Sequence, residues 1–329
     1  MRTFRLTKEE PLLDIASYAR GGPRAADRLS PAQIEHIHLT VSRAPEVMVK
    51  VLSKGSSDLK SVARHFDYID RQGDLALEGD GGYELHGWGG KALVEDWDLD
   101  LDELRPQVDR IDTRGRRPMK LVHKLVFSMP PGTPPQKVLL AVRNFAREEF
   151  YGQHRYAMVL HTDEPHPHVH LVVRALSEEG RRLNIKKATL RYWRAQFARH
   201  LRVQGVAANA TERAVRGESR NAPKDGVYRV SRRGDSTYMR AQAESVAREL
   251  ASGGVQPEPG KRTLLETRAA VQRGWQAAAD KLTQQGAPRL AADVVQFAGN
   301  LAQPLTKREW IARGLLAQVR ARQQEAMTL

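Results

Sequence analysis

Alternating apolar and polar positions predict five strands in the first two thirds of the chain. The predicted strands cover residues 34–42, 47–52, 120–129, 156–160 and 168–175. In the first of these segments, Ile37, Leu39 and Val41 alternate with polar side chains. Since successive strand residues point to opposite faces, each segment presents an apolar face on which a core can form.

Apolar residues spaced three and four positions apart predict helices between these strands. The predicted helices cover residues 59–69, 135–150 and 189–201, with a short one over 12–20. Ser57 or Asp58 is the expected N-cap of the first, after a turn at 55–57. Residues 79–90 are expected to form a loop, and the acidic run 95–103 is expected to open a solvated helix.

The last third of the chain has a helical pattern interrupted by proline. Pro288 and Pro304 divide it into three stretches, and two candidate capping boxes are Thr263-x-x-Glu266 and Thr306-x-x-Glu309. We expect an α+β protein with a central antiparallel sheet, flanking helices and a helical C-terminal region. The expected parts are an N-terminal extension (1–33), a main domain (34–220), a basic and polar linker (221–260) and a helical region (261–329).

The composition adds a strong positive charge to this picture. The 329 residues carry a formal net charge of +14, and the isoelectric point is about 10.1. A field of this sign favours polyanions, nucleic acid first and an acidic membrane surface second. Between Arg181 and Arg240 there are 16 Lys or Arg against 4 Asp or Glu. A positive charge that is concentrated in one segment points to a polyanionic partner more specifically than an excess spread evenly along the chain.

Other classes of protein are disfavoured by what the sequence lacks. Cysteine is absent, which excludes a disulfide framework and any thiolate metal site. No apolar run approaches the roughly 18 residues of a membrane span. The first residues, 1–11, contain charges but no apolar stretch after them, so no secretory signal is expected there.

Four of the 11 histidines lie within residues 161–170. His168 and His170 are two apart in a predicted strand and so project from one face, about 7 Å apart along the strand. Residues 162–167 contain two prolines and an aspartate and can turn the chain back. An antiparallel hairpin of this kind sets His161 beside the other two, so that three imidazoles can converge on one ion.

The surroundings of the cluster favour a rigid metal site. The apolar run 171–173 indicates that its strand is central in the sheet, and Asp163 and Glu164 are local acceptors for the outer imidazole nitrogens. On affinity alone, three imidazoles favour Zn²⁺, Ni²⁺ or Cu²⁺. A site that polarises a phosphate oxygen can instead use Mg²⁺ or Mn²⁺ through availability, with water and substrate completing the shell.

With cysteine absent, a covalent nucleophile must be Ser, Thr, Lys or Tyr. Tyr68 stands out because charged and polar residues surround it within 62–73. His65 lies three residues before it, so the two share one face of the predicted helix. A phenol is protonated at neutral pH, and it needs a cation or a base to react. A metal-bound phosphate or the neighbouring imidazole can meet that need.

Three motifs in this order resemble those of conjugative DNA relaxases. They are Tyr-Ile-Asp-Arg-Gln-Gly (68–73), Lys-Leu-Val-Phe-Ser-Met-Pro-Pro-Gly (124–132) and His-x-Asp-x-x-His-Pro-His-x-His (161–170). The resemblance is to the P class of mobilisation proteins, HUH endonucleases that include the T-DNA border nickase. It covers residues 36–220 and ends in Arg-Ala-Val-Arg-Gly (213–217). The third motif is the most specific of them.

This resemblance implies a role for each matching residue. Tyr68 attacks the DNA phosphate and becomes joined to the 5′ end, and Ser128 helps to hold DNA near the nick. Asp163 supports the histidine cluster or takes part in moving the tyrosine proton, while the role of His166 is left open. The implied ligands of the divalent ion, Mg²⁺ or Mn²⁺, are His161, His168 and His170.

Further DNA contacts are expected from basic residues. The basic segment 181–240 is expected to follow the DNA backbone, with Tyr192 and Trp193 stacking on bases. The residues expected to contact phosphates are Arg71, Lys186, Lys187, Arg213 and Arg216. Binding through such contacts is expected to weaken steeply with salt.

The function implied by the resemblance is strand-specific nicking and rejoining of DNA at a transfer origin. The main domain, 34–220, is then the catalytic one. Expected partners are single-stranded or locally melted DNA, accessory proteins of the relaxosome and the coupling protein of a type IV secretion system. The expected location is the bacterial cytoplasm, with export of the protein covalently attached to transferred DNA.

Three other functions fit parts of the pattern. A rolling-circle replication initiator or a single-tyrosine transposase shares the chemistry, but the order of the motifs favours a mobilisation relaxase. A non-haem iron oxygenase requires a facial triad from His161, Asp163 and a distal histidine, for which only His200 follows the cluster. A non-catalytic DNA-binding module holding a structural ion predicts that Tyr68→Phe changes no activity.

Overall fold

The computed structural model describes residues 28–52, 57–87, 89–102, 119–218, 236–254 and 258–328. Contacts divide the chain into two compact units. The sheet unit comprises 43–210, and the helical unit combines 1–42 with 211–329. The expected main domain, 34–220, therefore includes residues of both units. The helix expected over 12–20 lies outside the described residues, as do most of the turn at 55–57 and most of the linker before 236.

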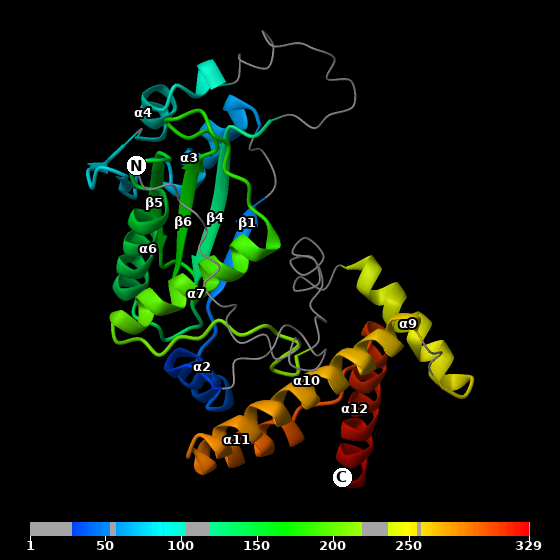
Figure 1. The fold of residues 1–329 in the computed structure, drawn as a ribbon. Coiled ribbons are helices and arrows are strands. Elements are labelled where there is room, and N and C mark those ends of the chain that lie inside the picture. The colour runs from blue at the N-terminus through cyan, green and yellow to red at the C-terminus, as the bar shows by residue number, and fades with distance from the viewer. Residues whose placement is uncertain are drawn as a thin grey trace, which may run out of the picture. The chain divides into compact units, whose positions relative to one another are not determined.

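The sheet unit is built on an antiparallel sheet in the order β1-β4-β6-β5-β2-β3. Its strands in the described ranges are β1 Met48–Leu52, β2 Leu77–Gly79, β3 Glu84–Leu85, β4 Val122–Ser128, β5 Tyr156–His161 and β6 His168–Arg174. Figure 1 shows β5, β6, β4 and β1 side by side. The histidine strand β6 has neighbours on both sides, so the prediction of a central antiparallel strand is confirmed.

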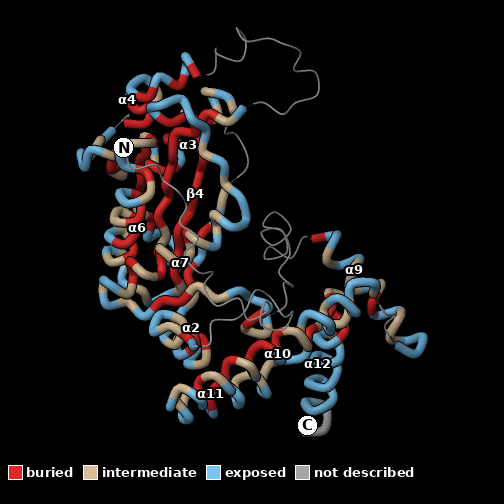
Figure 2. Tube along the Cα trace, in the orientation of Figure 1, coloured by how far each residue is buried: buried red, intermediate tan, exposed pale blue. Residues whose placement is uncertain are grey.

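Helices cover both faces of this sheet. On one face, α6 (Pro135–Phe150) and α7 (Lys187–Val203) enclose a core that includes Phe127 and Phe145. On the other, α3 (Leu59–Ile69) and α4 (Gly89–Asp96) pack through Phe66 and Leu93. Asp58 caps α3 by accepting a hydrogen bond from the backbone of Ser61. β4 is buried along its whole length between the two layers (Figure 2).

The segment between α3 and β4 differs from its prediction. Instead of a plain loop over 79–90, β2 and β3 form a short hairpin, and α4 already begins at Gly89. These strands are too short to show a reliable alternation. The acidic run is also less solvated than expected, since Trp97 and Leu99 are fully buried. The ring of Trp97 packs edge-on against Phe66, 5.8 Å away, and anchors the end of this segment to α3.

The prediction of a strand over 34–42 is wrong, because these residues form helix α2 (Pro31–Val41). Ser30 accepts a hydrogen bond from the backbone of Gln33, and the Gln33 side chain accepts one from the backbone of Ser30. This capping box, with Pro31 at the first helical position, favours a helix over the alternating pattern. Ile34, Ile37 and Val41 also lie on one helical face and pack in the helical unit.

The remainder of the helical unit consists of α9 (Thr237–Ala251), α10 (Gly260–Gln284), α11 (Pro288–Gly299) and α12 (Lys307–Thr328). α10 packs with α11 around Trp275, α2 packs on α11, and α9 packs with α12. The separation of three helical stretches by proline is confirmed. None of the helices in the described ranges combines the length and the apolar composition that a membrane crossing requires.

Two local predictions for this unit have opposite outcomes. Thr306 and Glu309 form a reciprocal capping box at the start of α12. Thr263 does not cap a helix, because α10 begins at Gly260 and Thr263 lies inside its first turn. Residues 237–251, expected within a linker, form α9 instead, with Ser236 as its N-cap.

Candidate metal and nucleophile site

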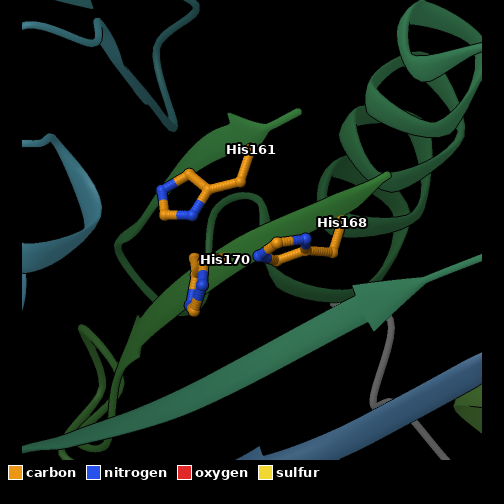
Figure 3. A group of neighbouring side chains, drawn as sticks. All are labelled: His161, His168 and His170. Carbon is orange, nitrogen blue, oxygen red and sulfur yellow. The ribbon is translucent and has the colours of Figure 1, made fainter. Parts of the chain in front are cut away.

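The hairpin of β5 and β6 brings three histidines together on the α3 face of the sheet. His161 pairs directly with His168 across the two strands, and His170 follows two residues later on the same face. Nitrogen atoms of the three rings lie within 4.8 Å of one another. Figure 3 shows the rings of His161, from β5, and of His168 and His170, from β6, projecting to the same side. The predicted convergence of three imidazoles is therefore present in the fold.

Backbone carbonyls hold two of the three rings. His161 donates from Nε2 to the carbonyl of Ile69 at 2.7 Å, and His168 donates from Nδ1 to the carbonyl of His166 at 3.0 Å. A carbonyl only accepts, so these bonds leave His161 Nδ1 and His168 Nε2 as lone-pair donors. The outer acceptors are thus main-chain atoms rather than the expected Asp163 and Glu164.

The cluster has the electrostatic character of a metal site. Burial lowers the pKa of His170 to about 3, and burial also lowers the pKa of His161. The imidazoles of His161 and His170 are therefore neutral at neutral pH, which is the form that binds metal. His170 Nδ1 is buried and has no hydrogen-bond partner among the described residues. A divalent ion among these rings would give His170 Nδ1 the partner that it lacks among the described residues.

Tyr68 lies in the last turn of α3, against two of the three histidines. Its ring centroid is 6.0 Å from that of His170 and 6.4 Å from that of His161. The side chain remains 54% exposed, so a large substrate can reach it. His65, one turn earlier, stacks on the Tyr68 ring at 6.2 Å, and burial lowers the pKa of His65 to about 4. The prediction that these two residues share a helix face is confirmed.

Arg71 connects the tyrosine to the histidine hairpin. Its guanidinium lies 5.1 Å from the centre of the Tyr68 ring, forms an ion pair with Asp163 and approaches His161 Nδ1 at 3.3 Å. It also donates from Nη1 to the backbone carbonyl of Tyr68 at 3.2 Å. Asp163 therefore contacts Arg71 rather than a histidine. The fold brings these two predicted residues together at the site.

A left-handed turn aims Arg71 at this position. Arg71, Gln72 and Gly73 follow α3 with φ angles of 55°, 61° and 95°. Side chains other than glycine rarely adopt this region, so the first two residues are held there at some cost by the surrounding structure. The motif that begins at Tyr68 thus contains the end of α3, the cation of Arg71 and the sharp turn that brings this cation to the site.

Ser128 and Lys124 extend the site along β4. Ser128 pairs with His168 across the β4–β6 ladder and is buried on the histidine face. Lys124, four residues earlier on the same face, donates from Nζ to the carbonyl of Ser61 in α3 at 3.2 Å. Burial lowers the pKa of Lys124 to about 8. Strand alternation predicts that Lys124 and Ser128 share one face of β4. That helix α3 covers Lys124 could not be predicted from the sequence and is seen only in the fold.

The remaining predicted DNA contacts lie on other elements of the fold. Lys186 and Lys187 are exposed at the start of α7, which covers the opposite face of the sheet. Arg213 and Arg216 belong to the helical unit, where Arg216 pairs with Glu218. Their roles remain predictions.

Three residues of α7 have structural surroundings that bear on their predicted roles. The prediction that Trp193 stacks on bases is wrong, because it is fully buried and donates from Nε1 to Glu149. Tyr192 is partly buried against the same core. His200, the distal ligand required by the oxygenase alternative, lies 3.0 Å from Glu148.

Comparisons with known proteins agree with this geometry. Residues 87–206 match the family model described as Relaxase: MobA/VirD2-like, nuclease domain. The T-DNA border endonuclease VirD2 of Agrobacterium fabrum is 24% identical over 219 residues, covering 60% of this chain and 46% of that protein. The T-DNA border endonuclease VirD2 of Rhizobium rhizogenes is 24% identical over 208 residues, covering 53% and 42%. The chain thus spans less than half the length of these relatives.

Proposed function

We propose, from the premise that residues 87–206 form a nuclease domain of the MobA/VirD2-like relaxase type, that this chain nicks one DNA strand at a transfer origin and retains the cut end on Tyr68. The observation that carries the proposal is the position of Tyr68, exposed and about 6 Å from the histidine rings. A nucleophile beside a set of imidazole ligands is an arrangement that supports phosphodiester cleavage through a covalent intermediate.

In this proposal the metal ligands are His161, His168 and His170. A divalent ion bound to them, proposed to be Mg²⁺ or Mn²⁺ on grounds of availability, supplies Lewis-acid stabilisation of the phosphate. The rings themselves are pre-oriented by the carbonyls that accept from the first two. That fixed orientation reduces the reorganisation needed during reaction.

The covalent step uses residues of α3. The Tyr68 oxygen forms a bond to phosphorus, and the bond from phosphorus to the 3′ oxygen breaks. The phenolic proton is transferred by way of His65, whose imidazole is neutral, and the departing 3′ oxygen ends protonated. Arg71 stabilises the negative charge that builds up on the phenol oxygen and the phosphate. The products are a 5′-phosphotyrosine and a free 3′ hydroxyl.

This chemistry conserves the energy of the phosphodiester bond. The free 3′ hydroxyl can attack the phosphotyrosine and restore the strand, which a hydrolytic nuclease cannot do. We propose on this basis a role in initiating conjugative transfer or mobilisation, in the bacterial cytoplasm, with accessory proteins and a type IV coupling protein as partners. The support for these partners is the likeness to relaxases alone.

The proposal is tested with supercoiled plasmid carrying the transfer origin of the element that encodes the chain, plus Mg²⁺ or Mn²⁺. We expect nicking of one strand and a protein attached to the 5′ end, both lost in Tyr68→Phe and both blocked by a chelator. Tyr151→Phe, which removes an exposed phenol at the end of α6, is the matched control. A covalent adduct that persists in Tyr68→Phe excludes this nucleophile, and nicking that is unaffected by chelation excludes the proposed role of the histidines.

A further inference from the structure

The histidine face of the sheet is covered unevenly. The core beneath α3 and α4 draws its strand residues from β2, β4, β5 and β6. At the β1 edge, the side chains on this face are Met48, Lys50 and Leu52, as the pairing with β4 shows. Met48 is 45% exposed and Lys50 is exposed, whereas Val49 and Val51 of the same strand pack in the core on the opposite face.

The register places these two exposed residues in line with the histidines. Met48 pairs with Ser128, Ser128 pairs with His168, and His168 pairs with His161. In the next row, Lys50 pairs with Val126 and Val126 with His170. Since neighbouring strands are about 4.8 Å apart, Met48 and Lys50 lie roughly 10 Å from the β6 histidines across the sheet.

We propose that the exposed face of β1 is a binding track for the DNA strand that is cut. The ammonium of Lys50 pairs with a backbone phosphate of that strand, and the thioether of Met48 contacts a neighbouring base. This inference rests on the proposed function, because it extends the substrate from the phosphate at the metal site across β4 to the sheet edge.

Three features favour a single DNA strand as the occupant. The track is continuous with the proposed catalytic site through the row that contains Ser128. Its exposed charge is positive, as is the net charge of +14 for the whole chain, which complements a phosphate backbone. It also combines a cation with a polarisable apolar side chain, the pairing of contacts that a flexible strand with accessible bases can use.

The charge contact is tested by replacing one cation at a time in the full chain. Lys50→Ala is compared with Arg147→Ala, which removes an exposed cation from α6 on the opposite face of the sheet. Binding of a fluorescent single-stranded oligothymidylate is measured from low to high salt. For Lys50→Ala we expect weaker binding at low salt and a salt slope shallower by about 0.7, the value for one lost phosphate contact. Wild-type affinity and slope in Lys50→Ala would overturn the inference.

The position of the strand is tested by cross-linking. Because the chain contains no cysteine, Met48→Cys introduces a unique thiol. Leu140→Cys places a thiol of similar exposure on α6 and serves as the control. An oligonucleotide with one thiol-reactive tether should react with Met48→Cys much faster than with the control. Equal rates, or disulfide-linked protein dimers formed in preference to the DNA adduct, would contradict the track.

Failure of the track and failure of the proposed function give different results. If the wild type nicks its origin through Tyr68 while Lys50→Ala and Met48→Cys behave like their controls, the track is wrong and the function stands. If the Met48→Cys thiol captures DNA but the wild type forms no Tyr68 adduct on its origin, the track holds and the nuclease proposal fails.

Discussion

Main-chain carbonyls determine which nitrogen of His161 and of His168 keeps its lone pair for an ion. The acceptor for His168 is the carbonyl of His166, an atom that no substitution of the His166 side chain removes. The bond is therefore formed by the backbone of a residue whose side chain is exposed. The two neighbouring histidines therefore have separable roles, one through its ring and the other through its backbone.

This separation gives a direct prediction for metal binding. His168→Ala should weaken binding of Mn²⁺ by more than about tenfold, because it removes a ligand. His166→Ala should leave the affinity close to that of the wild type, since the carbonyl remains. Calorimetric titration of the two variants provides the comparison. Equal losses in both would mean that the His166 ring is itself a ligand.

A buried histidine away from the metal site predicts an acid-sensitive fold. Burial lowers the pKa of His123 to about 4 from an unfolded value near 6.5, and its Nε2 donates to the carbonyl of Leu183. Its Nδ1 is buried without a partner among the described residues, so a proton there gains no acceptor. The unfolded chain then binds more protons between these pH values, and stability falls as the pH drops from 6.5 towards 4.

The contribution of His123 can be isolated by substitution. Relative to the wild type, His123→Gln should reduce the loss of stability between pH 7 and pH 4 by up to about 3 kcal/mol. Chemical denaturation at both pH values measures the difference, with His86→Gln, at an exposed position, as the control. A pH dependence that is unchanged in His123→Gln would show that this ring is not responsible.

Individual residues of the site also differ in whether their positions can be predicted from the sequence. The three histidines were predictable because strand alternation fixes the face of each side chain. The contact of Arg71 with Tyr68, His161 and Asp163 was not, because it depends on consecutive left-handed residues. Such a conformation has no signature in a sequence apart from the glycine at its end.

That glycine, Gly73, lies in the connection from α3 to the short β2–β3 hairpin. Gly73 has a φ of +95°, and a Cβ added to it would lie 2.7 Å from the carbonyl oxygen of Gly87. The backbone of the segment after β3 thus passes directly against the end of the nucleophile helix. The helix end and the hairpin are held together by contact between main chains.

We expect Gly73→Ala to destabilise the protein by roughly 3 kcal/mol or more, through both strain and this contact. Gly82→Ala is a matched control, since Gly82 has a φ of +75° but nothing within 4 Å of an added Cβ. Gly82→Ala should lower the free energy of unfolding by only about 1 kcal/mol, the cost of placing alanine at a positive φ. Urea unfolding of both variants measures the difference. A similar loss of stability in the two variants would show that the backbone at Gly87 moves away from the added Cβ at no cost in free energy.

Elements differ in how well their sequence predicts them. β4, α6, β5, β6 and α7 were predicted to within about two residues, because each has a long run with one clear period. α2 was assigned to the wrong class, since Ile37, Leu39 and Val41 fit a strand as well as a helix. The capping box of Ser30 and Gln33 decides between them, and it lies just outside the alternating segment.

At the scale of the whole molecule, the basic segment of the sequence is divided between the two units. The proposed nucleophile, the histidines and the β1 track all lie on one face of the sheet unit. Arg213 and Arg216 lie in the helical unit, although the sequence places them in the same basic segment as Lys186. Charge counted along the chain predicts a polyanionic partner, but the distribution of charge between units appears only in the fold.

The helical unit combines residues that precede the sheet unit in the sequence with residues that follow it. Leu29 and Ile37 pack with Trp275, and Gln285 exchanges hydrogen bonds with the backbone of Leu29. During synthesis on the ribosome, residues 43–210 are complete before α10 has been made. The sheet unit can therefore fold early, while the apolar face of α2 must wait for its partners. A chaperone that shields α2 in this interval would protect the nascent chain from misassembly.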